Sequence, residues 1–304
     1  MTLETEHLYK SFGAKQVLAD VSFRAEGGNA LGLLGRNGAG KTTTLRILMQ
    51  VFPADAGHVT LDGQPLIRER LKVGYMPEER GLYPKKKILE QLVYLGCLHG
   101  LKKGEAAASA RALLKRLEMS GVEEVKLETL SKGNQQKIQL AATLIADPDL
   151  VILDEPFSGL DPVNAGLLKD IVKELMARGK MVIFSSHQMN YIEEFCEEIC
   201  ILSGGRVAVS GNLTEIKRSY PRNVIALSGR DNAALLAGVK ALPFVREILP
   251  AHEGFWVRLE REEDKEALLH AVGGLDVDEF RVCEPSLNDI FVQYTTAGAE
   301  GGRA

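Results

Sequence analysis

The sequence has few of the features that mark secreted, membrane-spanning or zinc-stabilised proteins. Its 304 residues contain only four cysteines and no Cys-x-x-Cys pair, which argues against a disulfide scaffold or a zinc ribbon. No uninterrupted apolar stretch approaches the roughly 18 residues of a membrane-spanning helix. The first residues lack the basic-then-apolar pattern of a secretory signal. We therefore expect a protein that stays in the cytoplasm.

The cysteines are expected to be buried, reduced thiols. Cys196 and Cys200 lie four residues apart in a helical pattern, so they would share a helix face; the helix itself is predicted at 188–199. Zinc ligation by this pair is the weaker alternative, because no second pair of cysteines or histidines lies near it.

The sequence also lacks a strong excess of either charge. The formal net charge is −4, which gives no support to bulk binding of nucleic acid. Hydrophobic residues make up 45% and charged residues 26%, as in an ordinary globular protein. The length predicts one large domain or two modest ones.

The most informative segment present is a glycine-rich loop at residues 35–42, Gly-Arg-Asn-Gly-Ala-Gly-Lys-Thr. It matches the pattern G-x-x-x-x-G-K-[ST], and it lies between an apolar run at 30–34 and a helical pattern at 43–50. In such loops the backbone N–H groups surround phosphate oxygens, and the helix N-terminus adds partial positive charge. The predicted phosphate-binding residues are Arg36, Asn37, Gly38, Ala39, Gly40, Lys41, Thr42 and Thr43.

Two further segments carry groups suited to the same chemistry. The apolar run 150–153 ends in Asp154 and Glu155, so one carboxylate can hold Mg²⁺ through water while the next orients the attacking water. Residues 130–137, Leu-Ser-Lys-Gly-Asn-Gln-Gln-Lys, precede an apolar-periodic run, and Ser131 is predicted to cap a helix there. This is a second helix N-terminus suited to phosphate.

These segments, in this order, resemble those of the ATP-binding cassette ATPases over roughly the first 215 residues. The family signature Leu-Ser-Gly-Gly-Gln is similar to Leu-Ser-Lys-Gly-Asn at 130–134. Phe12 matches the aromatic that stacks on adenine, and Glu78 stands where a glutamine usually contacts Mg²⁺ and water. The D-loop is matched by residues 158–161, Ser-Gly-Leu-Asp, and the switch histidine by His187.

The resemblance implies a P-loop nucleotide triphosphatase that uses ATP and Mg²⁺. Two cassettes would dimerise head to tail, so that the signature of one subunit completes the nucleotide site of the other. The implied catalytic residues are Lys41, Glu155, Asp161 and His187, and the implied metal-binding residues are Thr42, Glu78 and Asp154. The residues implied to contact the partner's nucleotide are Ser131, Lys132, Gly133 and Asn134. Glu78, Lys132 and Asn134 depart from the family's usual glutamine, glycine and glutamine.

The predicted architecture is α/β, with a P-loop core, an antiparallel β subdomain and a helical subdomain at about 79–135, all within a cassette at 1–215. Residues 216–296 have the predicted order β-α-β-β-α-β, which suggests a small ferredoxin-like α+β accessory domain. Residues 297–304, rich in glycine, are expected to be a disordered tail.

The resemblance favours the ATPase subunit of a bacterial exporter, similar to sodium- or drug-efflux members, working with a separate multi-spanning membrane permease. We expect it at the inner face of the membrane, paired with a second copy of itself or a paralogous cassette. Residues 82–87, Leu-Tyr-Pro-Lys-Lys-Lys, are a candidate rim for docking a permease helix; a solvated charge run is the alternative. A soluble cassette ATPase acting on ribosomes or DNA is less favoured, because the chain has one cassette and no long coiled-coil insertion.

Overall fold

The computed structural model of the chain describes residues 1–67, 70–79, 81–157, 160–186 and 188–300. The chain divides into two compact units, Met1–Leu213 with the end of the chain from Tyr294, and Thr214–Gln293. None of the described helices is both long and apolar enough to cross a membrane.

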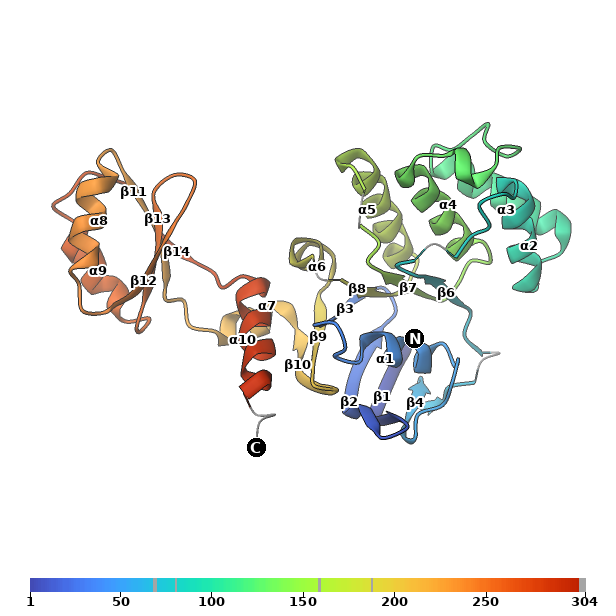
Figure 1. The fold of residues 1–304 in the computed structure, drawn as a ribbon, viewed down its shortest axis with the longest axis horizontal. Helices are drawn as coiled ribbons and strands as arrows, with labels where there is room; N and C mark the ends of the chain where they lie inside the picture. Colours follow the sequence, from blue (N-terminus) through green and yellow to red (C-terminus); the bar gives the residue numbers. More distant parts are fainter. Residues whose placement is uncertain (68–69, 80, 158–159, 187, 301–304) are drawn as a thin grey trace. The chain divides into compact units, whose positions relative to one another are not determined.

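A six-stranded sheet with the order β10-β9-β3-β8-β7-β6 forms the centre of the first unit (Figure 1). Only β10 is antiparallel to its neighbour. The parallel strands are continuous apolar runs because helices or other strands cover both faces. Their carboxyl ends meet at one edge, which places the segments after β3, β6, β7 and β8 close together. The strands are β3 (Ala30–Gly35), β6 (Val73–Met76), β7 (Leu150–Asp154), β8 (Met181–Ser185), β9 (Glu198–Ser203) and β10 (Arg206–Asn212).

An antiparallel sheet with the order β2-β1-β4-β5 packs against helix α1, on the side of the helix away from the parallel strands. Leu3, Leu8 and Leu18 from this sheet join Leu45 of α1 and Leu31 of β3 in one buried core, so the two sheets and the helix form a single packed body. The elements are β1 (Thr2–Phe12), β2 (Lys15–Glu26), β4 (Ala56–Leu61), β5 (Gln64–Pro65) and α1 (Lys41–Leu48).

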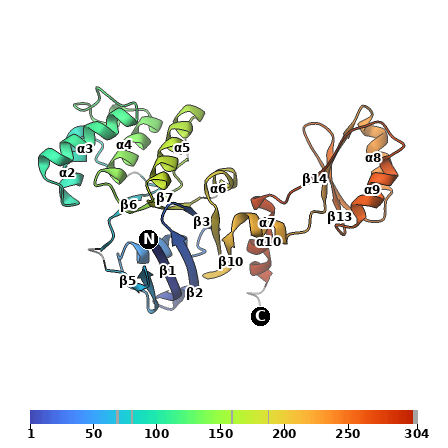
Figure 2. The same cartoon turned by 180° about the vertical axis from the view of Figure 1, so that it is seen from behind.

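The helices of the first unit lie mainly on the other face of the parallel strands (Figure 2). The segment predicted to be helical, 79–135, contains α2, α3 and a 3₁₀ turn, and the signature residues begin α4. The predicted cap of α4 is confirmed, because Ser131 Oγ accepts the Asn134 N–H at 3.3 Å. These helices are α2 (Ile88–Leu98), α3 (Lys103–Arg116), η2 (Leu127–Thr129), α4 (Lys132–Leu144), α5 (Pro162–Ala177) and α6 (Met189–Phe195).

The second unit has the ferredoxin-like order that the sequence predicts. Its antiparallel sheet is arranged β12-β13-β11-β14, with α8 and α9 connecting the strands and packing on one face. The elements are β11 (Val224–Gly229), α8 (Asn232–Lys240), β12 (Val245–Pro250), β13 (Phe255–Leu259), α9 (Asp264–Val272) and β14 (Val277–Cys283). Helix α7 (Leu213–Ser219) comes before these elements in the chain and α10 (Leu287–Glu300) comes after them. Helix α10 therefore includes residues 297–300, which the glycine content had placed in the tail; residues 301–304 lie outside the described residues.

The predicted helix at 188–199 is wrong in its second half. Helix α6 ends at Phe195, and Ile199 and Cys200 belong to β9, which pairs with β3. The consecutive buried residues 199–202 are a typical buried strand, and the helical spacing upstream obscured it. Cys196 and Cys200 therefore do not share a helix face, although both are buried as expected. Cys97 is exposed and Cys283 is only partly buried, so the expectation of burial fails for these two.

Candidate functional site

A cavity of about 470 Å³ opens at the carboxyl edge of the parallel sheet. It is lined by residues 36–38 and 40–43 of the glycine-rich loop, by Lys15 and Val17 of β2, and by Glu78, Asp154 and Glu155. The tertiary structure thus brings the predicted phosphate loop and the three predicted carboxylates to one place. Ala39 does not line the cavity, and its side chain is buried in the core instead.

The backbone of the loop depends on glycine at its helix end. Gly40 has φ of 110°, in the left-handed region, and a Cβ there would lie 2.5 Å from Leu18 Cδ2. Helix α1 begins at the next residue, so its first N–H groups face the loop without side-chain caps. This is the arrangement in which phosphate oxygens can replace the missing hydrogen-bond acceptors.

Lys41 lies inside the loop. Its Nζ donates to Gly35 O at 2.5 Å and to Arg36 O at 3.5 Å. Burial lowers the pKa of Lys41, while the nearby carboxylates of Glu155, Asp154 and Glu78 act in the opposite direction. The lysine therefore sits between the loop and the acidic segments, where it can contact a bound phosphate.

Glu155 is held in an unusual backbone conformation at the end of β7. It has φ of 50°, which costs a non-glycine residue about 1–3 kcal/mol and is often found at functional sites. Its N–H donates to Ser185 O at 2.8 Å, and Ser186 Oγ donates to its Oε2 at 3.0 Å. The carboxylate is buried, yet it lines the cavity. Ser185 is the last residue of β8 and Ser186 follows it. The neighbouring strand therefore fixes the direction of the Glu155 carboxylate.

Asp154 has a partner that the sequence analysis missed. Tyr75 of β6 donates its hydroxyl to Asp154 Oδ2 at 3.3 Å. Burial, with Asp154 beside it, raises the pKa of the Tyr75 phenol to about 12. The phenol therefore remains a hydrogen-bond donor at neutral pH.

The oxygen donors in the cavity fit magnesium. The Thr42 hydroxyl and the carboxylates of Asp154 and Glu78 line the same cavity, and their oxygens are the hard ligands that Mg²⁺ prefers. Within the described part of the chain, no group of three acidic, histidine or cysteine side chains could hold a metal by itself. Mg²⁺ commonly binds through one or two carboxylates together with substrate phosphates and water, so Thr42, Asp154 and Glu78 are the residues that would hold it.

The signature residues lie elsewhere. Ser131, Lys132, Gly133 and Asn134 begin α4 and are not among the described residues that line the cavity. A Cβ on Gly133 would lie 3.0 Å from Asn164 Nδ2, so this turn packs on the start of α5. Asp161 caps α5, accepting the Asn164 N–H at 2.9 Å and its Nδ2–H at 2.6 Å, and these bonds lower the Asp161 pKa. The structure therefore groups Asp161 with the signature turn.

Phe12 lies at the end of β1 and is 49% exposed. Its ring packs edge-on against the ring of Phe52, with 5.4 Å between the two ring centroids. It pairs across the β1–β2 hairpin with Lys15, which lines the cavity. Lys15 and Val17 carry no motif, so the sequence offered no signal for them. His187, Ser158 and Gly159, which the sequence analysis singled out, lie outside the described residues.

Each of the two units matches a known protein family. Residues 18–158 match the family described as "ABC transporter", and residues 211–295 match "ATP-binding protein DrrA1-3-like, C-terminal domain". An uncharacterised ABC transporter ATP-binding protein of Alkalihalophilus pseudofirmus is 44% identical over 263 residues, covering 86% of this chain and 97% of the relative.

Two other matches extend this result. The Nod factor export ATP-binding protein I of Burkholderia lata is 32% identical over 298 residues, covering 96% of each chain. A solved structure described as the ATP-binding subunit of an ABC transporter superposes with a TM-score of 0.65 at 30% identity, covering 72% of this chain and 92% of that one. The chain therefore belongs to the ABC transporter ATP-binding proteins, whose cassettes bind and hydrolyse ATP.

Proposed function

We propose that this chain is the ATP-hydrolysing subunit of a membrane exporter and drives a separate multi-spanning permease at the inner face of the membrane. The observation that carries the proposal is an open groove on the helical segment, lined in part by Tyr83, Lys86 and Lys87, which follow Glu78 in the chain. A relative named for Nod factor export supports the direction of transport.

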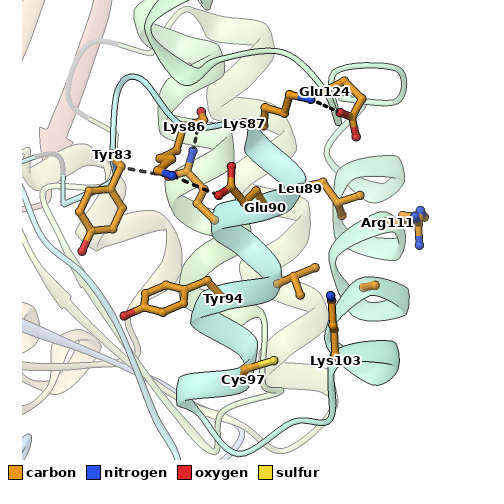
Figure 3. A pocket seen from close by; sticks show the side chains of 13 residues that line it. Tyr83, Lys86, Lys87, Leu89, Glu90, Tyr94, Cys97, Lys103, Arg111 and Glu124 are labelled. Atoms are coloured by element: carbon orange, nitrogen blue, oxygen red, sulfur yellow. Dashed lines mark hydrogen bonds and ion pairs between the residues drawn. The ribbon is translucent and has the colours of Figure 1, made fainter.

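The groove lies between α2 and α3 and has a volume of about 960 Å³ (Figure 3). The rings of Tyr83 and Tyr94 are about half exposed, and Leu89 and Val93 add apolar surface. Figure 3 shows charged residues around the same groove, including an ion pair between Lys87 and Glu124 with a length of 2.7 Å. An apolar floor with a charged rim suits an amphipathic helix of a partner protein.

The groove connects to the nucleotide cavity through one short segment. Gln91 of α2, 2% exposed, accepts the Tyr83 N–H at 3.2 Å and so fixes the loop at its groove end. Glu78, five residues before Tyr83, lines the nucleotide cavity. A partner helix in the groove would therefore contact the same loop that carries a metal-side carboxylate.

We further propose a head-to-tail dimer of two cassettes. The phosphate loop and carboxylates form one cavity, whereas Ser131–Asn134 lie outside it, so each cavity lacks the signature half of its site. A second copy, or a paralogous cassette, can supply Ser131 and Gly133 to the γ-phosphate and close the site. ATP then joins the two subunits.

Within this composite site we assign roles by position. Lys41 and the loop N–H groups hold the phosphates, and Phe12, exposed beside the cavity, offers a ring to adenine. Mg²⁺, when bound by Thr42, Asp154 and Glu78, neutralises phosphate charge. Glu155 accepts a proton from the attacking water, and Asp161 stabilises the signature turn at the interface. The role of His187, which is to orient Glu155, is assigned from the resemblance alone, because His187 lies outside the described part of the chain.

The permease proposal is tested by co-purification. The tagged chain is extracted from host membranes in mild detergent, and a multi-spanning protein at near-equal amount supports the proposal. Tyr94→Glu, which puts a charge in the groove, should lose that partner. Leu98→Glu is the matched control, because Leu98 is exposed on the same helix but does not line the groove. Recovery with ribosomal or DNA-bound proteins and no membrane partner would contradict it.

A further inference from the structure

Helix α4 presents a row of polar side chains to the acidic segments. Gln136, Gln139 and Thr143 are spaced three and four residues apart, so they share one helix face. Gln139 is only 4% exposed and Thr143 9%. Burying a carboxamide is unfavourable unless its polar atoms are hydrogen-bonded, so the partners of this row are informative.

The best-placed of these side chains is Gln139. Its Nε2 donates to Pro77 O at 2.8 Å and has a longer contact of 3.4 Å with Glu79 O. Those two carbonyls belong to the residues on either side of Glu78. The Glu78 side chain itself is exposed to the nucleotide cavity and has no part in these bonds.

The other side chains of the row reinforce this contact. Gln136 Nε2 donates to Pro156 O at 3.2 Å, next to Glu155. The Thr143 hydroxyl lies 3.3 Å from Tyr75 O, although its shorter hydrogen bond, 3.0 Å, goes to Gln139 O of the same helix. The helix also approaches β6 closely, because a Cβ on Gly74 would lie 2.5 Å from Thr143 O. One face of the helix that begins at the signature turn therefore holds the backbone beside two of the three cavity carboxylates, Glu78 and Glu155.

We propose that Gln139 is a positioning residue for ATP hydrolysis, which holds the 77–79 backbone so that the Glu78 carboxylate is directed into the nucleotide cavity. The inference rests on the proposed metal-side role of Glu78. A leucine or methionine at 139 could fill the same volume, but it would leave Pro77 O without its donor and allow the segment to move. The effect of Gln139 is thus exerted through Glu78 and should vanish without that carboxylate.

The test measures metal binding as well as turnover. The full chain is loaded with the non-hydrolysable analogue AMP-PNP, and Mn²⁺ binding is followed by electron paramagnetic resonance. Gln139→Met should weaken Mn²⁺ binding by about tenfold, as for other residues that orient a metal's ligands. Binding of AMP-PNP without metal should stay unchanged, which shows that the variant is folded. Gln139→Asn, which shortens the side chain by one methylene, gives the same comparison if the methionine variant does not fold.

Gln50→Met is the matched control. The Gln50 carboxamide also donates to a distant backbone carbonyl, Leu66 O at 2.9 Å, but it touches neither acidic segment. It should leave Mn²⁺ binding and ATPase activity unchanged, apart from a small loss of stability.

A double-mutant cycle distinguishes positioning from general support of the fold. In a Glu78→Ala background, Gln139→Met should change Mn²⁺ binding by less than about twofold, because the group it positions is gone. The same tenfold loss in both backgrounds would show that Gln139 acts on the fold at large and would overturn the proposal. No loss in either background, or no effect of Glu78→Ala alone, overturns it too. None of these outcomes bears on the permease, whose test is co-purification.

Discussion

The Tyr75 hydroxyl donates to Oδ2 of Asp154 across neighbouring parallel strands, at 3.3 Å. One oxygen of the Asp154 carboxylate thus accepts a hydrogen bond from a neutral donor, while the residue lines the nucleotide cavity. A neutral donor of this kind orients a carboxylate without competing for the charge that a metal ion needs.

The ionisation of Tyr75 should be visible in the metal-free protein. Its folded pKa of about 12 exceeds the usual value near 10, so the unfolded chain releases this proton first as pH rises. The stabilisation is fully present below about pH 10 and is lost as pH rises toward 12. In EDTA, ultraviolet titration should show a late-titrating tyrosine that Tyr75→Phe removes. Tyr94→Phe, which removes the hydroxyl of an exposed tyrosine, should leave that late titration in place.

Glu155→Gln should lower steady-state ATPase activity by about 10²-fold or more, because the variant cannot accept the proton of the attacking water. It should also accumulate as an ATP-bound dimer, since slow hydrolysis keeps the γ-phosphate bridge. Phosphate release and size-exclusion chromatography with and without ATP measure the two effects. Glu174→Gln, at an exposed ion pair with Arg116, is the control and should behave as the parent. Unchanged turnover in the Glu155 variant would remove this residue from the mechanism.

Mixing two inactive variants should restore activity if sites are shared between subunits. Lys41→Ala disables the phosphate loop, and Ser131→Arg blocks the signature turn. In a head-to-tail mixed dimer, one site carries both defects and the other carries neither. Random pairing makes half of the dimers mixed, and each mixed dimer has one intact site of two. The mixture should therefore regain up to about a quarter of the parent activity. ATPase assays across mixing ratios measure it, and activity equal to the sum of the separate variants would rule out shared sites.

Gly40→Ala should destabilise the protein more than Gly38→Ala. Both residues have positive φ, 110° and 82°, so both substitutions carry backbone strain of about 1–3 kcal/mol. Only Gly40 would also place a Cβ 2.5 Å from Leu18 Cδ2, whereas Gly38 has open space around it. Thermal unfolding and ATP binding of the two variants measure the difference. Equal loss of stability would mean that the Leu18 contact relaxes at little cost.

The sequence by itself determined the family and the chemistry. Residues 35–42 and 150–155 are contiguous motifs flanked by strands and helices, so local pattern and glycine stereochemistry suffice to predict a phosphate loop and a carboxylate pair. The Ser131 cap follows for the same reason, since its partner Asn134 is three residues away. The β-α-β-β-α-β order of the second unit was predictable because each of its elements carries its own periodicity.

Only the tertiary structure decided what depends on distant segments. Residues 198–203 form a strand because β3 lies beside them, although the spacing before them is helical. Lys15 reaches the cavity through a hairpin, Tyr75 reaches Asp154 across 79 residues, and Gln139 reaches Pro77 across 62. None of these contacts leaves a local signature, because a single hydrogen bond between remote segments imposes no repeat on the sequence.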